Sequence, residues 1–274
     1  MKFTFLTENK TQKEGVFGEH GLSILIETHG IRILFDAGAS DLLIRNAEKI
    51  GADLATVDLA AVSHGHYDHT GGFPAFHRMA PAAPIYIHKD AFREYHPFRN
   101  GKAGAGITGI RWSEQEKQVL QKVIRLTDGP EWINDDIVIS GTVPDIPGML
   151  RFGTYCYEDN GETVIDPMTH EQFIAVREAE GVFLFSGCSH KGVAPILKYC
   201  RELFPGDEIR AFVSGLHLYR SGYDIRKRVI GEIMKEDIGE VFPVHCTGIT
   251  AMCELKNAIG DKCVIPTAGE TYER

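Results

Sequence analysis

Short apolar runs near the N-terminus predict β-strands. The segments "KFTFLTE" (2–8), "LSILIET" (22–28) and "IRILFDAG" (31–38) are rich in apolar and β-branched residues and are bounded by polar or turn-forming residues. The dipeptide His29-Gly30 separates the last two runs, as expected for a tight turn between paired strands. Over residues 41–50 the apolar positions recur with helical spacing instead, which predicts an amphipathic helix.

The second half of the chain repeats a more regular pattern. Three apolar runs end in a short polar stretch that contains a histidine: "GVFLFSGCSH" (181–190), "IRAFVSGLH" (209–217) and "GEVFPVH" (239–245). Helix-like segments separate them, which predicts parallel strands joined by right-handed crossovers. Because the carboxyl ends of parallel strands share one edge of a sheet, we expect the three histidines to meet there: His190, His217 and His245.

The pattern between these two regions is less regular. The stretch "DLAAVSHGHYDH" (58–69) begins as a buried strand and runs into a polar cluster, and "PIYIH" (84–88) predicts another strand. Residues 91–112 mix glycine, aromatic and basic residues without periodicity, which predicts an irregular insertion that serves either as a binding segment or as a surface loop. No Pro/Gly/Ser-rich linker divides the chain, so we expect one domain over residues 1–274.

The polar cluster after the 58–62 run carries the clearest chemical signal. It places three imidazoles and a carboxylate within six residues: His64, His66, Asp68 and His69. On an extended segment His64 and His66 point the same way and are able to hold one ion. Asp68 and His69 follow across a turn, where they face a second ion or orient an attacking water. Imidazole and carboxylate ligands suit zinc, iron or manganese, which polarise substrate oxygens and lower the pKa of bound water towards about 7.

The remaining ligands of such a metal site have to come from other parts of the chain. His190 and His245, each at the end of a predicted strand, are the expected suppliers. His217 has the same setting, and its role is left open among a ligand, a hydrogen-bond partner of a ligand and a substrate contact.

Composition narrows the classes of partner. The chain has 274 residues, 43% of them hydrophobic, and a net charge of −9 without a Lys/Arg-rich run. An acidic chain of this kind is not expected to bind nucleic acid, so we expect a small-molecule substrate. The apolar stretch in "MKFTFLTENK" is too short for a signal peptide or a membrane span, so we expect a cytoplasmic protein with six reduced cysteines and no membrane association. The pattern does not specify an oligomeric state.

The segment "SHGHYDHTGG" resembles the most typical form of the H-x-H-x-D-H signature of the metallo-β-lactamase superfamily. The resemblance extends over nearly the whole chain, because "FDAG" places Asp36 where the superfamily carries an acidic residue near its metals, and "PVHCTG" resembles its late histidine segment. It implies an α/β fold of the αββα type, with two mixed sheets flanked by helices and one or two metal ions at the strand edge. It also implies zinc as the cofactor, with iron or manganese as alternatives.

One departure from the family pattern affects the second metal. Many relatives end the corresponding strand in Gly-Asp, whose carboxylate bridges two ions, whereas this chain has Cys188 at that point. His190 is expected to substitute as a ligand, and Cys188 either binds metal as a thiolate or packs as an inert buried side chain. Family geometry assigns His64, His66 and His190 to one ion. It assigns Asp68, His69 and His245 to the other.

The resemblance also suggests three alternative functions. The phrases "SGCSHKG", "SGLHL" and "PVHCTG" are similar to a branch of metal-dependent hydrolases that also contains an archaeal synthase of a dihydropterin-methyl-ribofuranosylaminobenzene phosphate. The leading hypothesis is a metallohydrolase in which Asp68 orients water and accepts its proton during attack on an ester, phosphoester or related bond of a small metabolite. The alternatives are a metal-dependent transferase of the synthase type and a metal-bound sensor or binding protein without turnover.

Basic residues in the 91–112 insertion offer a contact for an anionic substrate. Arg111, with Arg99 and Lys102, is a candidate to clamp a phosphate or carboxylate over the metal. The alternative reading is a solvated basic loop without a role in binding.

Overall fold

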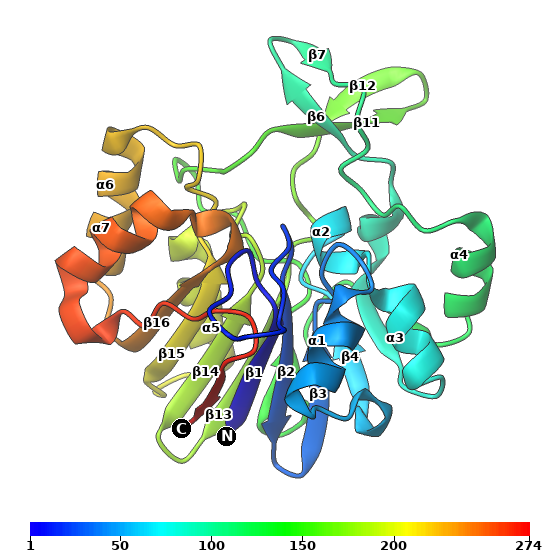
Figure 1. Cartoon of the computed structure of the whole chain (residues 1–274). Helices are drawn as coiled ribbons and strands as arrows, with labels where there is room; N and C mark the ends of the chain where they lie inside the picture. The colour runs from blue at the N-terminus through cyan, green and yellow to red at the C-terminus, as the bar shows by residue number, and fades with distance from the viewer. The chain divides into compact units, whose positions relative to one another are not determined.

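The computed structural model (Figure 1) describes all residues from 1 to 274. The chain divides into two compact units. Unit 1 consists of Met1–Asp128, Gly153–His170 and Thr267–Arg274, and unit 2 of Gly129–Phe152 and Glu171–Pro266. Each unit has a sheet and a hydrophobic core of its own, and the single domain over residues 1–274 stays a prediction.

Unit 1 is built on a seven-stranded sheet that carries the polar cluster. Its strand order is β17-β1-β2-β3-β4-β5-β8, antiparallel from β17 to β3 and parallel from β3 to β8. His29 and Gly30 both have left-handed φ angles, 47° and 73°, which matches the twist that a two-residue hairpin requires. The predicted strands and turn are therefore confirmed. The strands are β1 (Lys2–Thr7), β2 (Ser23–Thr28), β3 (Ile31–Phe35), β4 (Leu59–Ala61), β5 (Ile85–His88), β8 (Ile124–Thr127) and β17 (Thr271–Glu273).

The helices of unit 1 are short, and α1 (Leu42–Ile50) confirms the predicted amphipathic helix. Its buried residues Leu43 and Ala47 join Leu25 and Leu34 of the sheet in one core, and each fully buried leucine contributes roughly 1.5–3 kcal/mol. The helix ends at Gly51, whose left-handed backbone lets its N–H bond the carbonyl of Ala47. The other helical segments are η1 (Leu54–Thr56), α2 (Tyr67–Thr70), α3 (Phe73–Met79), η2 (Lys89–Phe92) and α4 (Glu114–Leu120).

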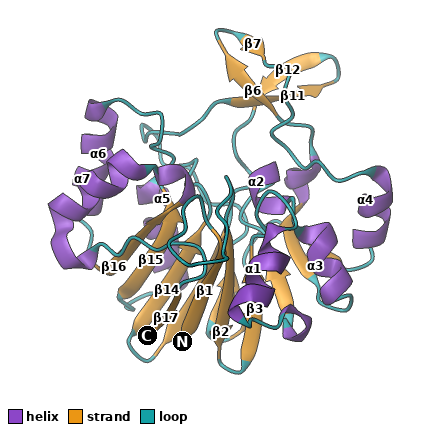
Figure 2. Ribbon diagram, viewed as in Figure 1, coloured by secondary structure: helices purple, strands orange, loops and turns teal.

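A second, four-stranded sheet of unit 1 lies where we expected an irregular insertion. Residues 91–112 contain a hairpin whose turn, Asn100-Gly101, has two left-handed residues with φ angles of 51° and 75°. Asn-Gly is the strongest short hairpin signal, and it outweighs the missing periodicity on either side. Figure 2 shows this small sheet apart from the seven-stranded one, connected to it by loops. Its order is β12-β11-β6-β7, with bounds β6 (His96–Arg99), β7 (Lys102–Ala103), β11 (Tyr155–Asp159) and β12 (Glu162–Ile165).

Unit 2 has a six-stranded sheet in the order β16-β15-β14-β13-β10-β9. Strands β14, β15 and β16 are parallel, and the helices α5 and α6 connect them, as the alternating pattern predicted (Figure 1). Buried side chains of α5, such as Ile196 and Leu197, pack with Leu184 and Phe212 of the sheet. The strands are β9 (Glu131–Asn134), β10 (Ile137–Ile139), β13 (Phe173–Glu178), β14 (Gly181–Ser186), β15 (Ile209–Gly215) and β16 (Ile238–Val244).

The helices of unit 2 all follow strands of this sheet. They are α5 (Val193–Leu203), α6 (Tyr223–Ile233) and α7 (Ile249–Ile259), with the short turns η3 (His245–Thr247) and η4 (Gly260–Lys262). Each of the three α-helices has 11 residues. None of the helices in the structure combines the length and the apolar character that crossing a membrane requires.

Candidate metal centre

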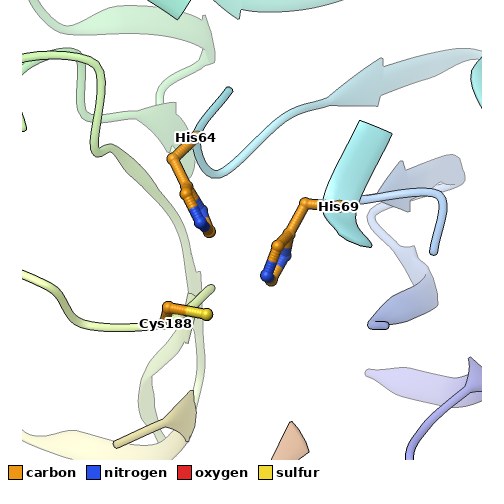
Figure 3. Close-up of side chains that lie close together, drawn as sticks. All are labelled: His64, His69 and Cys188. Carbon is orange, nitrogen blue, oxygen red and sulfur yellow. The ribbon is translucent and has the colours of Figure 1, made fainter. Parts of the chain in front are cut away.

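The polar cluster of unit 1 forms a compact group of side chains after β4. His66 is extended and precedes α2, so the two halves of the cluster lie on either side of a turn, as predicted. The Nε2 atom of His64 is 3.0 Å from Nδ1 of His66, and the ring centroids of His64 and His69 are 4.2 Å apart. Figure 3 shows the His64 and His69 side chains leaving the backbone in the same direction. All four residues of the cluster, Asp68 included, are at most 8% exposed.

Asp36, at the end of β3, fixes the orientation of this group. One carboxylate oxygen accepts a hydrogen bond from the Ser63 backbone N–H at 2.7 Å, and the other lies 2.7 Å from the Ser63 hydroxyl and 2.6 Å from Nδ1 of His69. Asp36 has a left-handed φ of 56°, an unfavourable conformation for a non-glycine residue that local contacts have to stabilise. Because the carboxylate holds Nδ1 of His69, the nitrogen of that ring that faces a metal is Nε2.

A buried pair that the sequence did not reveal supports the same loop. The Gly65 backbone N–H donates to Nδ1 of His170 at 2.9 Å, and Nε2 of His170 lies 3.1 Å from the Asp166 carboxylate. Burial raises the pKa of Asp166, but the hydrogen bond and charge of His170 outweigh it and hold that pKa below its usual value. Gly65 is required here, since a Cβ would stand 2.4 Å from the Ala91 carbonyl oxygen. Sequence reasoning did not single out His170.

His66 is held in its neutral form. Burial is the main cause that lowers the pKa of His66 to about 3, and the electrostatic interaction with the nearby His170 ring adds to it. The Tyr155 ring of the four-stranded sheet packs against the His66 ring, with centroids 4.4 Å apart. Metal ligation requires a neutral imidazole, so this environment favours metal binding over protonation at neutral pH.

Two further side chains adjoin the cluster. The Asp68 carboxylate is 3.3 Å from Nε2 of His20, a half-exposed histidine that sequence reasoning did not single out. The Arg111 guanidinium stacks 3.5 Å from the centroid of the Tyr67 ring and donates two hydrogen bonds to the Ile107 carbonyl. Arg111 therefore lies beside the motif helix α2, in a contact that fixes its guanidinium.

In unit 2, His190 is positioned mainly through its backbone. The Glu171 carboxylate is buried and accepts hydrogen bonds from the backbone N–H groups of His190 and Lys191, at 2.6 and 2.8 Å. The Nδ1–H of His190 donates to the Phe152 carbonyl at 2.7 Å, which directs Nε2 of the ring away from that carbonyl. Both oxygens of Glu171 therefore hold the loop that presents His190, a role that sequence reasoning did not single out.

Strand-end side chains of unit 2 form two groups that share Cys188, although the meeting of all three histidines stays a prediction. The ligand atoms of Cys188, His190 and His217 lie within 4.8 Å of one another, and so do those of Cys188, His245 and Cys246. His217 and His245 have left-handed φ angles of 48° and 49°, a conformation that costs roughly 1–3 kcal/mol per residue and clusters at functional sites. The parallel strands thus bring together residues that are far apart in the sequence.

The protonation of Cys246 reflects this crowding. Burial by itself would raise the pKa of its thiol, but hydrogen bonds with Cys188 and His217 and the charges of nearby imidazoles lower that pKa well below its ordinary value. Cys188, drawn in Figure 3, is also buried, with 2% of its surface exposed.

These donors fit a transition-metal ion. His69 and His190 each have Nδ1 fixed by an oxygen acceptor, which is the arrangement that metal-ligating histidines almost always show. Imidazole and thiol donors favour zinc, iron or copper, whereas magnesium and calcium prefer oxygen ligands. Both units therefore present side chains that suit a zinc-type ion.

Comparison with known proteins identifies the family of this chain. A family model described as the metallo-beta-lactamase superfamily matches residues 16–209, which include the HxHxDH cluster and His190. The chain belongs to the metallo-β-lactamase superfamily. The family resemblance and the fold class expected from the sequence are therefore confirmed.

Two curated relatives come from Methanocaldococcus jannaschii. The chain is 30% identical over 251 residues to the uncharacterized protein MJ0448, and the aligned region covers 91% of this chain and 92% of that protein. It is 26% identical over 246 residues to a 7,8-dihydropterin-6-methyl-4-(beta-D-ribofuranosyl)-aminobenzene-5'-phosphate synthase, which covers 86% of this chain and 83% of that protein. The branch that we expected from the sequence is thus represented among the relatives.

Solved structures of the superfamily share the fold. Tm1679, described as a metal-dependent hydrolase of the beta-lactamase superfamily, superposes with a TM-score of 0.85 at 29% identity, over 100% of this chain and 99% of that one. Zinc-bound PqqB from Methylobacterium extorquens superposes with a TM-score of 0.58 at 11% identity over the full length of both chains, which shows a common fold alone.

Proposed function

We propose that this superfamily member is a metallohydrolase that acts on an ester, phosphoester or related bond of a small metabolite. Its proposed metal ligands are His64, His66, Asp68, His69, His190 and His245, and its proposed cofactor is zinc, as one or two ions. The observation that carries the proposal is the buried imidazole cluster after β4, in which Asp36 fixes His69 in the tautomer that a metal ligand needs. All six cysteines are free thiols, which supports a reducing location such as the cytoplasm.

The chemistry divides between the ion and the chain. Zinc in such a site supplies a nucleophile at neutral pH and polarises the bond under attack. Asp68 orients the attacking water through a hydrogen bond to its carboxylate and takes up the proton that the water loses. Asp36 keeps the His69 ring in place during this step through its 2.6 Å contact with Nδ1.

Isotope transfer from water tests hydrolysis directly. The zinc-loaded chain is incubated with carboxylic esters, phosphomonoesters and phosphodiesters in water enriched in oxygen-18, beside the chelated protein and a His66→Ala variant. We expect one product to gain a single heavy oxygen, and we expect the rate to fall on chelation and in His66→Ala. His77→Ala, on α3 and outside the proposed ligand set, is the matched control and should retain the wild-type rate. Cleavage that persists at the wild-type rate in His66→Ala would contradict the proposal.

A transferase is the second candidate, because the synthase from M. jannaschii is similar to this chain over most of its length. A transferase of this type would use its metal to join a pterin to a phosphorylated ribofuranosylaminobenzene compound. Incubating the zinc-loaded chain with both compounds separates the readings, since a condensed product supports transfer and heavy-oxygen incorporation supports hydrolysis. Tight binding of a metabolite without turnover of any substrate would favour a sensor or binding protein instead.

A further inference from the structure

Two buried thiols of unit 2 form a pair that neither the family pattern nor the proposed ligand set assigns. The Sγ atoms of Cys188 and Cys246 are 3.2 Å apart, although the two residues lie 58 positions apart in the sequence. Cys188 follows β14 and Cys246 lies in η3, directly after β16. Cys200, by contrast, packs in the apolar core under α5, where burial raises the pKa of its thiol to about 12. The Cys188–Cys246 pair therefore differs from an ordinary core cysteine.

The sheet makes room for this pair. Strand β15 lies between β14 and β16 (Figure 1). Its last residue, Gly215, lies next to both cysteines. A Cβ on Gly215 would stand 2.6 Å from the Cys246 Sγ and 2.7 Å from the Gly187 carbonyl oxygen. Only glycine leaves this space open, so the Cys246 sulfur atom fits against the end of β15 because Gly215 has no side chain.

Imidazoles surround the two thiols. The ligand atoms of Cys188, His245 and Cys246 lie mutually within 4.8 Å. His217 approaches from the end of β15, and its Nδ1 atom is buried without a hydrogen-bond partner. Two sulfur donors and nearby ring nitrogens make a donor set that zinc accepts in tetrahedral geometry.

The sulfur–sulfur distance distinguishes metal binding from oxidation. Two thiolates on a tetrahedral zinc ion, each about 2.3 Å from it, lie about 3.8 Å apart, whereas a disulfide requires about 2.05 Å. The observed 3.2 Å is closer to the separation of two zinc ligands. Thiol donors also favour zinc over manganese or magnesium, because the latter ions prefer oxygen ligands.

We propose that Cys188 and Cys246 bind zinc together with His245, so that unit 2 has a dithiolate ligand set. This inference rests on the proposed function, because His245 is one of the proposed zinc ligands. It also explains how the chain could hold an ion without the bridging carboxylate of many relatives, because the thiolates would neutralise the charge of the ion instead. Cys246, which sequence reasoning treated as one of six reduced thiols, becomes a ligand of its own.

X-ray absorption at the zinc edge tests the pair in the wild-type chain and needs no folded variant. We expect sulfur scattering at about 2.3 Å beside nitrogen scattering at about 2.0 Å. Zinc bound with nitrogen and oxygen neighbours only would overturn the inference while leaving the proposed metallohydrolase intact. A disulfide between the two cysteines in the zinc-loaded chain, found by mass spectrometry without reduction, would overturn it as well.

Cobalt substitution assigns the sulfur ligands to residues. The cobalt-loaded wild type should show thiolate-to-cobalt charge-transfer absorption in the near ultraviolet. Cys188→Ser and Cys246→Ser should each lose about half of it, and Cys253→Ser, which changes an exposed cysteine of α7, should keep it in full. Unchanged absorption in both site variants, in protein shown to be folded by circular dichroism, would overturn the assignment. A His66→Ala variant that keeps the absorption and also binds as much metal as wild type would contradict the proposed function and not this inference.

Discussion

The two units position their candidate ligands in different ways. In unit 1 the ligands are neighbours in the sequence, and hydrogen bonds between side chains orient them, with Asp36 on His69 and the Ser63 hydroxyl 2.9 Å from Nδ1 of His64. In unit 2 the candidate ligands come from the ends of three strands, and contacts to the backbone orient them. Glu171 holds the N–H groups of His190 and Lys191 there.

Because of this difference, substitutions in the two units should affect different properties: metal binding in unit 1 and stability in unit 2. A ligand oriented through its ring nitrogen depends on the tautomer that its partner selects, so an isosteric change of the partner alters metal binding without altering the fold. A ligand oriented through its backbone depends on the loop, so a change of the partner lowers the stability of the unit first. Substitutions at four positions test this comparison, from the largest expected effect to the smallest.

Asp36→Ala should have the largest effect. It leaves the buried N–H of Ser63, the Ser63 hydroxyl and the His69 ring nitrogen without their acceptor, at about 1–3 kcal/mol each, so we expect a loss of at least about 3 kcal/mol in the free energy of unfolding. Asp36→Asn should cost much less stability, because its amide keeps the shape. Its N–H would donate to Nδ1 of His69 and move the ring proton to Nε2, so zinc affinity should fall about 10–100-fold.

Urea unfolding of the chelated variants and zinc titration of the folded ones check the Asp36 predictions. Asp36→Asn that binds zinc with wild-type affinity would show that the tautomer of His69 does not matter for the site.

Glu171→Gln should act on stability in unit 2. The amide keeps one acceptor for the backbone N–H of His190 or Lys191 and turns its NH2 group towards the other, so we expect a loss of about 2 kcal/mol in the free energy of unfolding. Glu202→Gln, on the exposed side of α5, is the control and should change stability by less than about 0.5 kcal/mol. Equal unfolding midpoints for the two variants would show that the Glu171 hydrogen bonds do not stabilise the loop that presents His190.

The His170 variants test the support of the motif loop by a smaller effect. Asn at this position keeps an acceptor near the place of Nδ1, so it preserves the hydrogen bond from the Gly65 N–H, whereas Ala removes it. We expect His170→Asn to be about 1 kcal/mol more stable than His170→Ala and to bind zinc more tightly. If denaturant unfolding and zinc titration give the same values for both variants, the Gly65 contact does not support the site.

Arg111→Ala should have the smallest effect on the folded chain. It removes an exposed guanidinium from the face of Tyr67, a contact that contributes about 0.5–1 kcal/mol, and it should leave the zinc content unchanged. If Arg111 also binds an anionic substrate, KM for a phosphoester should rise while KM for a neutral ester stays constant. Equal KM changes for both substrates would assign Arg111 to the packing of α2 alone.

Local spacing and strand topology explain what the sequence predicted. His64 and His66 lie two residues apart on extended chain, so their proximity follows from backbone geometry alone. The proximity of His190 and His217, whose ring centroids are 4.5 Å apart, follows from the rule that parallel strands end at one edge, and it required only the recognition of the apolar runs before them.

The residues that sequence reasoning missed take their roles from contacts between segments that are far apart in the sequence. His170 accepts the hydrogen bond of the Gly65 N–H from a segment that belongs to unit 1 but follows residues 129–152 of unit 2. No periodicity in the sequence marks this segment. The pairing of Cys188 with Cys246 depends on β15 lying between β14 and β16 and on the missing side chain of Gly215. The hairpin at Asn100-Gly101 did have a local signal, the Asn-Gly pair itself, which the prediction of an irregular insertion did not use.

Metal content per chain is the most direct test of the proposed centre. Wild type, His66→Ala, His245→Ala and the control His77→Ala are loaded with zinc, freed of loosely bound metal and measured by elemental analysis. The account predicts about one or two zinc ions per wild-type and control chain, and a lower content in both His66→Ala and His245→Ala, although the two residues belong to different units. Wild-type zinc content in either of these two variants would contradict it.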